Sequence, residues 1–195
     1  MGDGILFAAA TAPGQEAGIY WSEPTGLAPL VMYPDGQLAG ERVGSDGEDI
    51  VWTEVDFSSG DQWKYPRHLM TSKWSLDVEA NMSTKRNLGI DIPYSDSSFL
   101  PAWAVGCGYA ARTFRGPLAK DEAEVGMLRI VRLSDGATWS IKGGTPADPK
   151  GQVFYWTNVY GITCDEIWVD ATNSTDSGFY RIRLDSLGPP TPAVQ

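Results

Sequence analysis

Four short runs of hydrophobic residues recur along the chain, at residues 4–9, 49–54, 108–113 and 166–171. Each run opens with a glycine or an acidic residue, and their first hydrophobic positions are 45, 59 and 58 residues apart. A second strand is predicted to start near Ile19, Leu69, Leu128 and Tyr180. Residues 128–130 and 180–184 alternate between hydrophobic and polar types, and this period of two predicts antiparallel strands with one buried face.

Further strands complete each unit. Third strands are predicted at residues 88–92 and 138–141, the latter after the hairpin signal Asp135-Gly136. Strands at residues 37–43, 99–105 and 153–162 lead into three of the four runs. Apart from residues 118–125, no window of ten residues keeps a helical period without glycine or proline. The pattern predicts an all-β repeat protein with one domain over residues 1–195 and units at 1–36, 37–98, 99–152 and 153–195.

Two of these segments carry a resemblance to a known family. Residues 45–54 resemble the blade opening, and residues 128–136 the partner strand, of bacterial β-propellers of the TolB and WD40-like beta repeat type. The resemblance implies antiparallel four-stranded blades and a β-propeller, or partial propeller, of about four blades. The first unit lacks its leading strand, so either residues 189–195 complete that sheet or the chain is part of a larger propeller.

Composition and charge disfavour several classes of binding partner. The 22 glycines and 13 prolines are typical of a turn-rich chain. A net charge of −10 disfavours nucleic acid and anionic membrane surfaces as partners. The longest apolar run, residues 5–10, is too short to cross a bilayer, so we predict no membrane insertion. We expect a periplasmic or secreted location if the chain belongs to a longer exported protein, and a cytoplasmic one otherwise.

The two cysteines, Cys107 and Cys164, both lie just ahead of a recurring strand in consecutive units. Equivalent positions in adjacent blades lie side by side, which brings a disulfide within reach. Two buried free thiols are the alternative. With His68 as the single histidine, we predict no metal site.

Two further features of the sequence bear on cofactor binding and catalysis. Residues 106–111 match the dinucleotide pattern G-x-G-x-x-A, but Gly116-Pro117 would break the helix that this motif must open. We therefore expect a glycine-rich start of a strand, and no cofactor. His68 has no nucleophile motif beside it and is expected to be exposed or at a strand edge.

Three carboxylates could act as a catalytic pair. Glu54, Asp56 and Asp170 end corresponding strands and could point toward one face of a propeller. A glycosidase needs only two carboxylates about 5 to 10 Å apart, so a glycan-active enzyme is the alternative function. Acidic residues at strand ends also cap turns or remain in solvent.

Aromatic residues suggest a core and a binding site. Five tryptophans in or beside strands are expected to fill seams between blades: Trp52, Trp103, Trp139, Trp156 and Trp168. Trp63, Tyr65 and Trp74, in the long connection of the second unit, could stack on sugar rings or anchor that loop. Asn81 and Asn173 begin glycosylation sequons.

The sequence therefore predicts a non-enzymatic binding or scaffold module in a bacterial cell-envelope setting. Its partner would be a protein or a glycan bound through the blade loops. The repeat and the lack of a catalytic motif support this interpretation.

Overall fold

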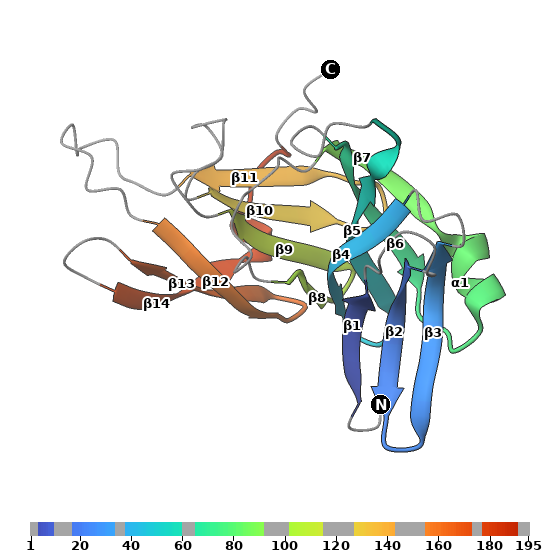
Figure 1. Ribbon diagram of the computed structural model, residues 1–195. Helices are drawn as coiled ribbons and strands as arrows, with labels where there is room; N and C mark the ends of the chain where they lie inside the picture. Colours follow the sequence, from blue (N-terminus) through green and yellow to red (C-terminus); the bar gives the residue numbers. More distant parts are fainter. Residues whose placement is uncertain are drawn as a thin grey trace. The chain divides into compact units, whose positions relative to one another are not determined.

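A computed structural model describes residues 4–9, 17–33, 38–59, 65–91, 102–114, 127–142, 155–172 and 177–190. The described chain is all-β, with four antiparallel sheets of three or four strands and one short α-helix (Figure 1). The chain divides into two compact units, residues 1–94 and residues 95–195. The fold class is thus confirmed as all-β, and the single-domain interpretation stays a prediction.

The first compact unit holds two sheets, which we call A and B. Sheet A consists of β1 (Ile5–Ala9), β2 (Ala17–Glu23) and β3 (Gly26–Tyr33), in that order. Sheet B consists of β4 (Leu38–Ser45), β5 (Asp49–Asp56), β6 (Arg67–Lys73) and β7 (Arg86–Asp91). The 3-10 helix η1 (Phe57–Ser59) and helix α1 (Val78–Thr84) lie in the connections of sheet B. Each sheet is a meander, because its strands follow one another in sequence order.

One hydrophobic core joins sheets A and B. Strand β5 is buried from Asp49 to Val55, so both of its faces are covered. Ile19 of sheet A and Trp52 of sheet B are both fully buried in this core. A sheet of three or four strands needs such a cover, because an isolated small sheet cannot bury enough hydrophobic surface to be stable.

The second compact unit holds sheets C and D. Sheet C consists of β8 (Ala104–Gly106), β9 (Tyr109–Phe114), β10 (Met127–Arg132) and β11 (Thr138–Lys142). Sheet D consists of β12 (Tyr155–Ile162), β13 (Glu166–Thr172) and β14 (Ser177–Arg183), followed by the 3-10 helix η3 (Leu184–Ser186). Ile130 and Trp139 of sheet C pack in one core with Ile167 and Val169 of sheet D.

The recurring runs form strands as expected, and the leading strands predicted at 37–43 and 153–162 correspond to β4 and β12. Of the leading strand predicted at 99–105, residues 102 and 103 are not in a strand, β8 begins at Ala104, and residues 99–101 lie outside the described residues. β1, β5, β9 and β13 start at or within one residue of the predicted first hydrophobic positions. Helix α1 has only seven residues, and Asp77 begins it by accepting hydrogen bonds from the backbone N–H groups of Glu79 and Ala80. The expected helical possibility at residues 118–125 lies outside the described residues.

The turn between β10 and β11 is held by an ion pair. Asp135 accepts two hydrogen bonds from the Arg132 guanidinium, at 2.9 and 2.6 Å, and a third from the Ala137 N–H at 3.1 Å. Gly136 has a φ of +74°, a conformation that glycine adopts without strain. Hydrogen bonding by Arg132, and then by Ala137, lowers the pKa of Asp135 from 3.8 to about 2.

We expect the Arg132→Gln variant to raise the pKa of Asp135 toward its ordinary value, because it removes the larger cause of the shift. The folded-state pKa is the lower one, so the stabilisation is complete above about pH 4 and is lost as the pH falls through about 2. A carboxyl-detected NMR titration of both proteins measures this. Titration of wild-type Asp135 at its ordinary value would contradict the expectation.

Candidate functional site

Sheet D has one buried face and one exposed face. Along β13, Ile167, Val169 and Ala171 are buried in the core, whereas Trp168 is 39% exposed. Neighbouring residues of a strand point to opposite faces, so Trp168 and Asp170 share the outer face. Of the eight exposed large hydrophobic residues in the described part of the chain, four belong to sheet D: Tyr160, Trp168, Phe179 and Tyr180. This sheet is therefore where exposed hydrophobic surface concentrates.

A pair of stacked rings lies on the outer face of sheet D. Tyr160 of β12 and Phe179 of β14 are 58% and 61% exposed, and their ring centroids are 4.7 Å apart with planes inclined by 29°. Asp170 of β13 lies opposite Phe179 in the strand register. Its carboxylate accepts hydrogen bonds from the Tyr160 hydroxyl at 3.0 Å and from the Asn158 N–H at 2.6 Å. Asp170 thereby fixes the Tyr160 ring in place.

Trp168 is the next residue of β13 on the same face. The Arg181 guanidinium lies 5.7 Å from the centroid of the Trp168 ring, within cation–π range. Arg181 also approaches the Glu166 carboxylate at 3.8 Å. On the other side of Trp168, β12 presents Gly161, where an added Cβ would meet no atom within 4 Å. Space beside Trp168 is therefore open.

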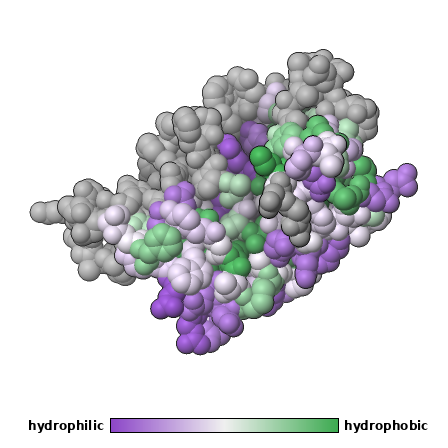
Figure 2. All heavy atoms as spheres, turned by 90° about the horizontal axis from the view of Figure 1, so that it is seen from below, coloured by the Kyte–Doolittle hydropathy of each residue, from purple (hydrophilic) through white to green (hydrophobic). Residues whose placement is uncertain are grey.

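We call Tyr160, Trp168, Asp170, Phe179 and Arg181 the aromatic face. The hydrogen bond to Asp170 and the ring stacking hold Tyr160 and Phe179 in place, so binding through these two rings would cost little side-chain entropy. In Figure 2, hydrophobic residues (green) form small groups among more hydrophilic ones (white to purple) on the part of the surface that is coloured. Isolated exposed hydrophobic residues are common on soluble proteins, whereas an exposed cluster of them is a candidate binding surface.

The aromatic face was not predicted from the sequence. The expectation that Trp168 fills a buried seam was wrong, although Trp52, Trp103, Trp139 and Trp156 are buried. The signal was present in the alternation of β13, because Trp168 is in phase with Asp170 and out of phase with Ile167 and Val169.

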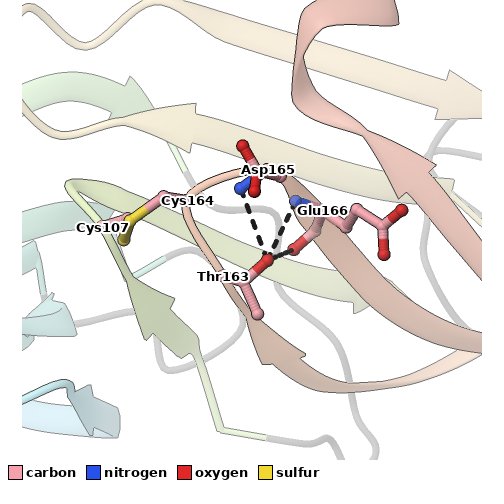
Figure 3. Close-up of a disulfide and its surroundings, with 5 residues drawn as sticks. All are labelled: Cys107, Thr163, Cys164, Asp165 and Glu166. Carbon is pink, nitrogen blue, oxygen red and sulfur yellow. Dashed lines mark hydrogen bonds between the residues drawn. A yellow bond between two sulfur atoms is a disulfide. The ribbon is translucent and has the colours of Figure 1, made fainter.

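Cys107 and Cys164 form a disulfide across sheets C and D, with their Cα atoms 5.1 Å apart (Figure 3). Cys107 lies in the turn between β8 and β9, and Cys164 in the turn between β12 and β13. The two turns are in close contact, because a Cβ on Gly106 would lie 2.3 Å from the Ile162 carbonyl oxygen. Beside Cys164, the Thr163 hydroxyl accepts a hydrogen bond from the Glu166 N–H at 3.1 Å and from the Asp165 N–H at 3.4 Å (Figure 3).

Glu54 belongs to a buried cluster in the first compact unit. Its carboxylate forms an ion pair with the Lys85 ammonium group, and both side chains are largely buried. The Tyr33 hydroxyl hydrogen-bonds to Glu54 and accepts a hydrogen bond from the Trp52 Nε1–H at 2.7 Å. Lys85 Nζ lies 4.9 Å from the Tyr33 ring centroid. We call these four residues the Glu54 cluster.

Burial, followed by the negative charge of Glu54, raises the pKa of Tyr33 far above its ordinary value of 10.0. Tyr33 therefore remains a protonated hydrogen-bond donor to Glu54 across the usual pH range. Every charged or polar group of the Glu54 cluster thus has a partner within the fold.

The other two candidate carboxylates are separate from this cluster. Asp56, at the end of β5, accepts a hydrogen bond from the Ser58 N–H at 2.8 Å, and hydrogen bonding by Ser58 lowers its pKa. Asp170 lies in the second compact unit. Thus Glu54 and Asp56 share a strand, and Asp170 organises the aromatic face.

Two of the three predicted loop aromatics contact other rings. Tyr65 packs edge-on against Phe57 with centroids 4.9 Å apart, and Trp74 packs edge-on against Trp21 at 5.1 Å. Both contacts fit the role of loop anchors. Trp63 lies outside the described residues.

The structure also decides two weaker hypotheses. After Gly108 the chain forms strand β9 and no helix, so residues 106–111 lack the helix N-terminus that a dinucleotide site requires. His68 is half-buried in β6, an inner strand of sheet B opposite Glu54, so the expectation of an exposed or edge position was wrong.

Asn81, in one of the two sequons, has a structural role. It is fully buried, and its side-chain amide donates hydrogen bonds to the carbonyl oxygens of Leu30 at 2.9 Å and Ser75 at 2.6 Å. These bonds tie helix α1 to sheet A, so Asn81 is inaccessible to a glycosyltransferase in the folded protein. The second sequon asparagine, Asn173, lies outside the described residues.

We expect the Asn81→Ala variant to lower the free energy of unfolding by about 2 to 3 kcal/mol, because it leaves two carbonyl groups without their donor. Ser83→Ala is the matched control: it also removes the sequon, but its side chain is exposed. Urea unfolding of the three proteins measures the difference. Equal losses in both variants would contradict the structural role of Asn81.

No family model, curated protein or solved structure matches this chain. Among the described helices, none has the length and apolar character needed to span a bilayer. The described residues contain no group of three or more His, Cys, Asp or Glu side chains arranged to hold a metal ion. Function is therefore argued from the geometry of the site.

Proposed function

We propose that this chain is a non-enzymatic binding module and that it recognises a protein partner with the aromatic face. The observation that carries the proposal is the cluster of exposed rings held in place on sheet D by Asp170 and strand pairing. Tyr, Trp and Arg are the residue types that most often dominate the binding energy of protein interfaces. A glycan could also stack on such rings, and the experiment below separates the two partners.

The candidate carboxylates support binding over catalysis. A glycosidase needs a carboxylic acid with a raised pKa, whereas hydrogen bonding lowers the pKa of Asp56. The Glu54 carboxylate is neutralised by Lys85, and that of Asp170 is occupied by Tyr160 and Asn158. No described geometry favours the glycan-active alternative.

We further propose that the four sheets are propeller-like blades of the TolB and WD40-like type. Each sheet is an antiparallel meander and falls within one of the four units expected from the sequence. Sheets A and D each have three described strands, and sheets B and C each have four, which is close to the four strands of a blade. A crystal structure with the sheets arranged radially about one axis would support this, and any other arrangement would refute it.

The disulfide supports an oxidising location for the protein, such as a periplasm or the cell exterior.

The binding proposal is tested with a double variant, Tyr160→Ser with Trp168→Ser, which removes two rings and leaves β14 unchanged. The matched control is Leu27→Ser with Leu76→Ser, which removes two hydrophobic side chains that are 57% and 59% exposed in the first compact unit. Each protein is immobilised, exposed to an extract of its source organism, and analysed by quantitative mass spectrometry. In parallel, each is tested for retardation by soluble polysaccharides in affinity electrophoresis.

We expect at least one protein to be retained by the wild type and the control, and lost by at least tenfold with the Tyr160/Trp168 variant. Loss of polysaccharide binding in that variant, without any change in protein capture, would make the partner a glycan. Identical behaviour of all three proteins in both assays would overturn the assignment of the aromatic face.

A further inference from the structure

Strand β14 (Ser177–Arg183) is at the end of the sheet order β12-β13-β14 and pairs with β13 alone among the described strands. It has seven residues, contains no proline, and is mostly exposed. Phe, Tyr and Ile in its sequence favour strand structure. An edge strand of this kind offers unpaired backbone groups to another strand.

The hydrogen-bond pattern shows which backbone groups of β14 point away from β13. Leu184 N–H donates to the Asp165 carbonyl at 2.8 Å, so these two residues form a hydrogen-bonded pair of the antiparallel ladder. Hydrogen-bonded and non-hydrogen-bonded pairs alternate along such a ladder. The register then directs the backbone groups of Gly178, Tyr180 and Ile182 toward β13. Four residues direct theirs away from β13: Ser177, Phe179, Arg181 and Arg183.

Length and charge together favour one way for two copies of β14 to pair, because an axis at Tyr180, the central residue of the strand, pairs all seven of its residues. With a twofold axis at Tyr180, Phe179 lies opposite Arg181 of the second copy, and Ser177 lies opposite Arg183. The backbone groups of these four residues point outward, so each of these two kinds of pair would form both of its hydrogen bonds. Moving the axis to Arg181 or Ile182 would place arginine opposite arginine, which is destabilising. A slip of one residue would exchange the two faces of the strand.

The favoured register also pairs the side chains. Phe179 and Arg181 both lie on the outer face, so each ring would lie beside the guanidinium group of the other copy, at a distance suited to a cation–π contact. The Arg181 side chain is 63% exposed and its contact with Glu166 is long, at 3.8 Å, so it is available for this contact.

We propose that β14 is a homodimerisation edge, where two copies of the chain pair antiparallel about Tyr180 into one six-stranded sheet. The proposal goes beyond the binding function and does not depend on it. It also places two aromatic faces on one continuous sheet surface, which would give the dimer two binding sites side by side.

The first test is sedimentation of the purified chain over a range of concentrations. We expect a concentration-dependent dimer for the wild type and a monomer for Arg181→Pro, because proline removes an outward N–H group without touching the ladder to β13. Arg181→Val keeps the N–H group and should still dimerise, with weaker association. Circular dichroism checks that all three are folded.

The second test is a cross-link that needs no proline. In Tyr180→Cys the two new thiols would face each other across the twofold axis and form an intermolecular disulfide. In Arg183→Cys they would be six residues apart along the paired strands, roughly 20 Å, and should not. Non-reducing electrophoresis distinguishes the two variants, and decides the question if Arg181→Pro is unfolded.

A monomeric wild type at the highest concentration would overturn the proposal. The same holds if folded Arg181→Pro remains dimeric, or if Arg183→Cys cross-links as readily as Tyr180→Cys. Partner binding is tested separately with the Tyr160/Trp168 variant, which leaves β14 unchanged, so failure of the dimer and failure of the binding proposal are distinguishable.

Discussion

Replacing Lys85 by methionine should lower the free energy of unfolding by about 3 to 5 kcal/mol, the largest effect that we expect from one substitution. Methionine retains most of the volume of the side chain, so the loss comes from the charge. Glu54 is 9% exposed and would keep a buried carboxylate without its cation. The hydrogen bond from Tyr33 does not replace a full positive charge.

Two comparisons make this prediction specific. Adding Glu54→Gln to Lys85→Met removes the stranded charge and should restore a large part of the lost stability. Asp185→Asn breaks an ion pair with Arg183 whose side chains are 66% and 68% exposed, and should cost at most about 1 kcal/mol. Urea unfolding measures all four proteins. If the double variant is no more stable than Lys85→Met, then the buried charge is not the cause of the loss.

Removal of the disulfide should have the second largest effect. Cys107 and Cys164 are 57 residues apart in the sequence, and closing a loop of that length restricts the unfolded chain by an amount equivalent to about 4 kcal/mol. We therefore expect the variant with both cysteines replaced by serine to unfold at a much lower urea concentration. The packing of sheets C and D through their shared core remains in this variant, so the native fold should persist.

The backbone at Cys107 offers a refinement. Its φ is +49°, in the left-handed region that favours glycine. Cys107→Gly with Cys164→Ser should therefore be more stable than the double serine variant, by about 1 kcal/mol.

Reductant provides the control for the disulfide. It should shift the unfolding midpoint of the wild type toward that of the double serine variant and leave the variant unchanged. Detection of two free thiols in the non-reduced native protein would contradict the disulfide itself.

Strand positions followed from the sequence because their signals are local. Alternation at residues 180–184 requires only that neighbouring side chains point to opposite faces, and Asp135-Gly136 encodes a hairpin within two residues. The start of α1 was also encoded locally, in Asp77, but seven residues are too few to show a helical period. The near match of β1, β5, β9 and β13 to the expected starts reflects this local coding.

The roles of individual residues could not be predicted from the sequence, because they depend on how the strands pair in the folded protein. Tyr160 lies in a register shift of β12 between Val159 and Gly161, and such a shift changes the face on which a side chain lies. Lys85 directly follows α1 and forms its ion pair with Glu54 of β5, which is 31 residues earlier in the chain. Neither the face on which Tyr160 lies nor the ion pair between Lys85 and Glu54 can be predicted from the spacing of residues along the chain.

The sequence by itself determined an all-β chain of antiparallel strands, because periodicity and turn residues act over a few positions. Only the tertiary structure decided which side chains are buried together and which remain exposed. Glu54 became part of a closed cluster, Asn81 a bond between α1 and sheet A, and Trp168 part of an outer face. The physical reason is that burial and electrostatic pairing depend on distances in space, which strand register and sheet packing set.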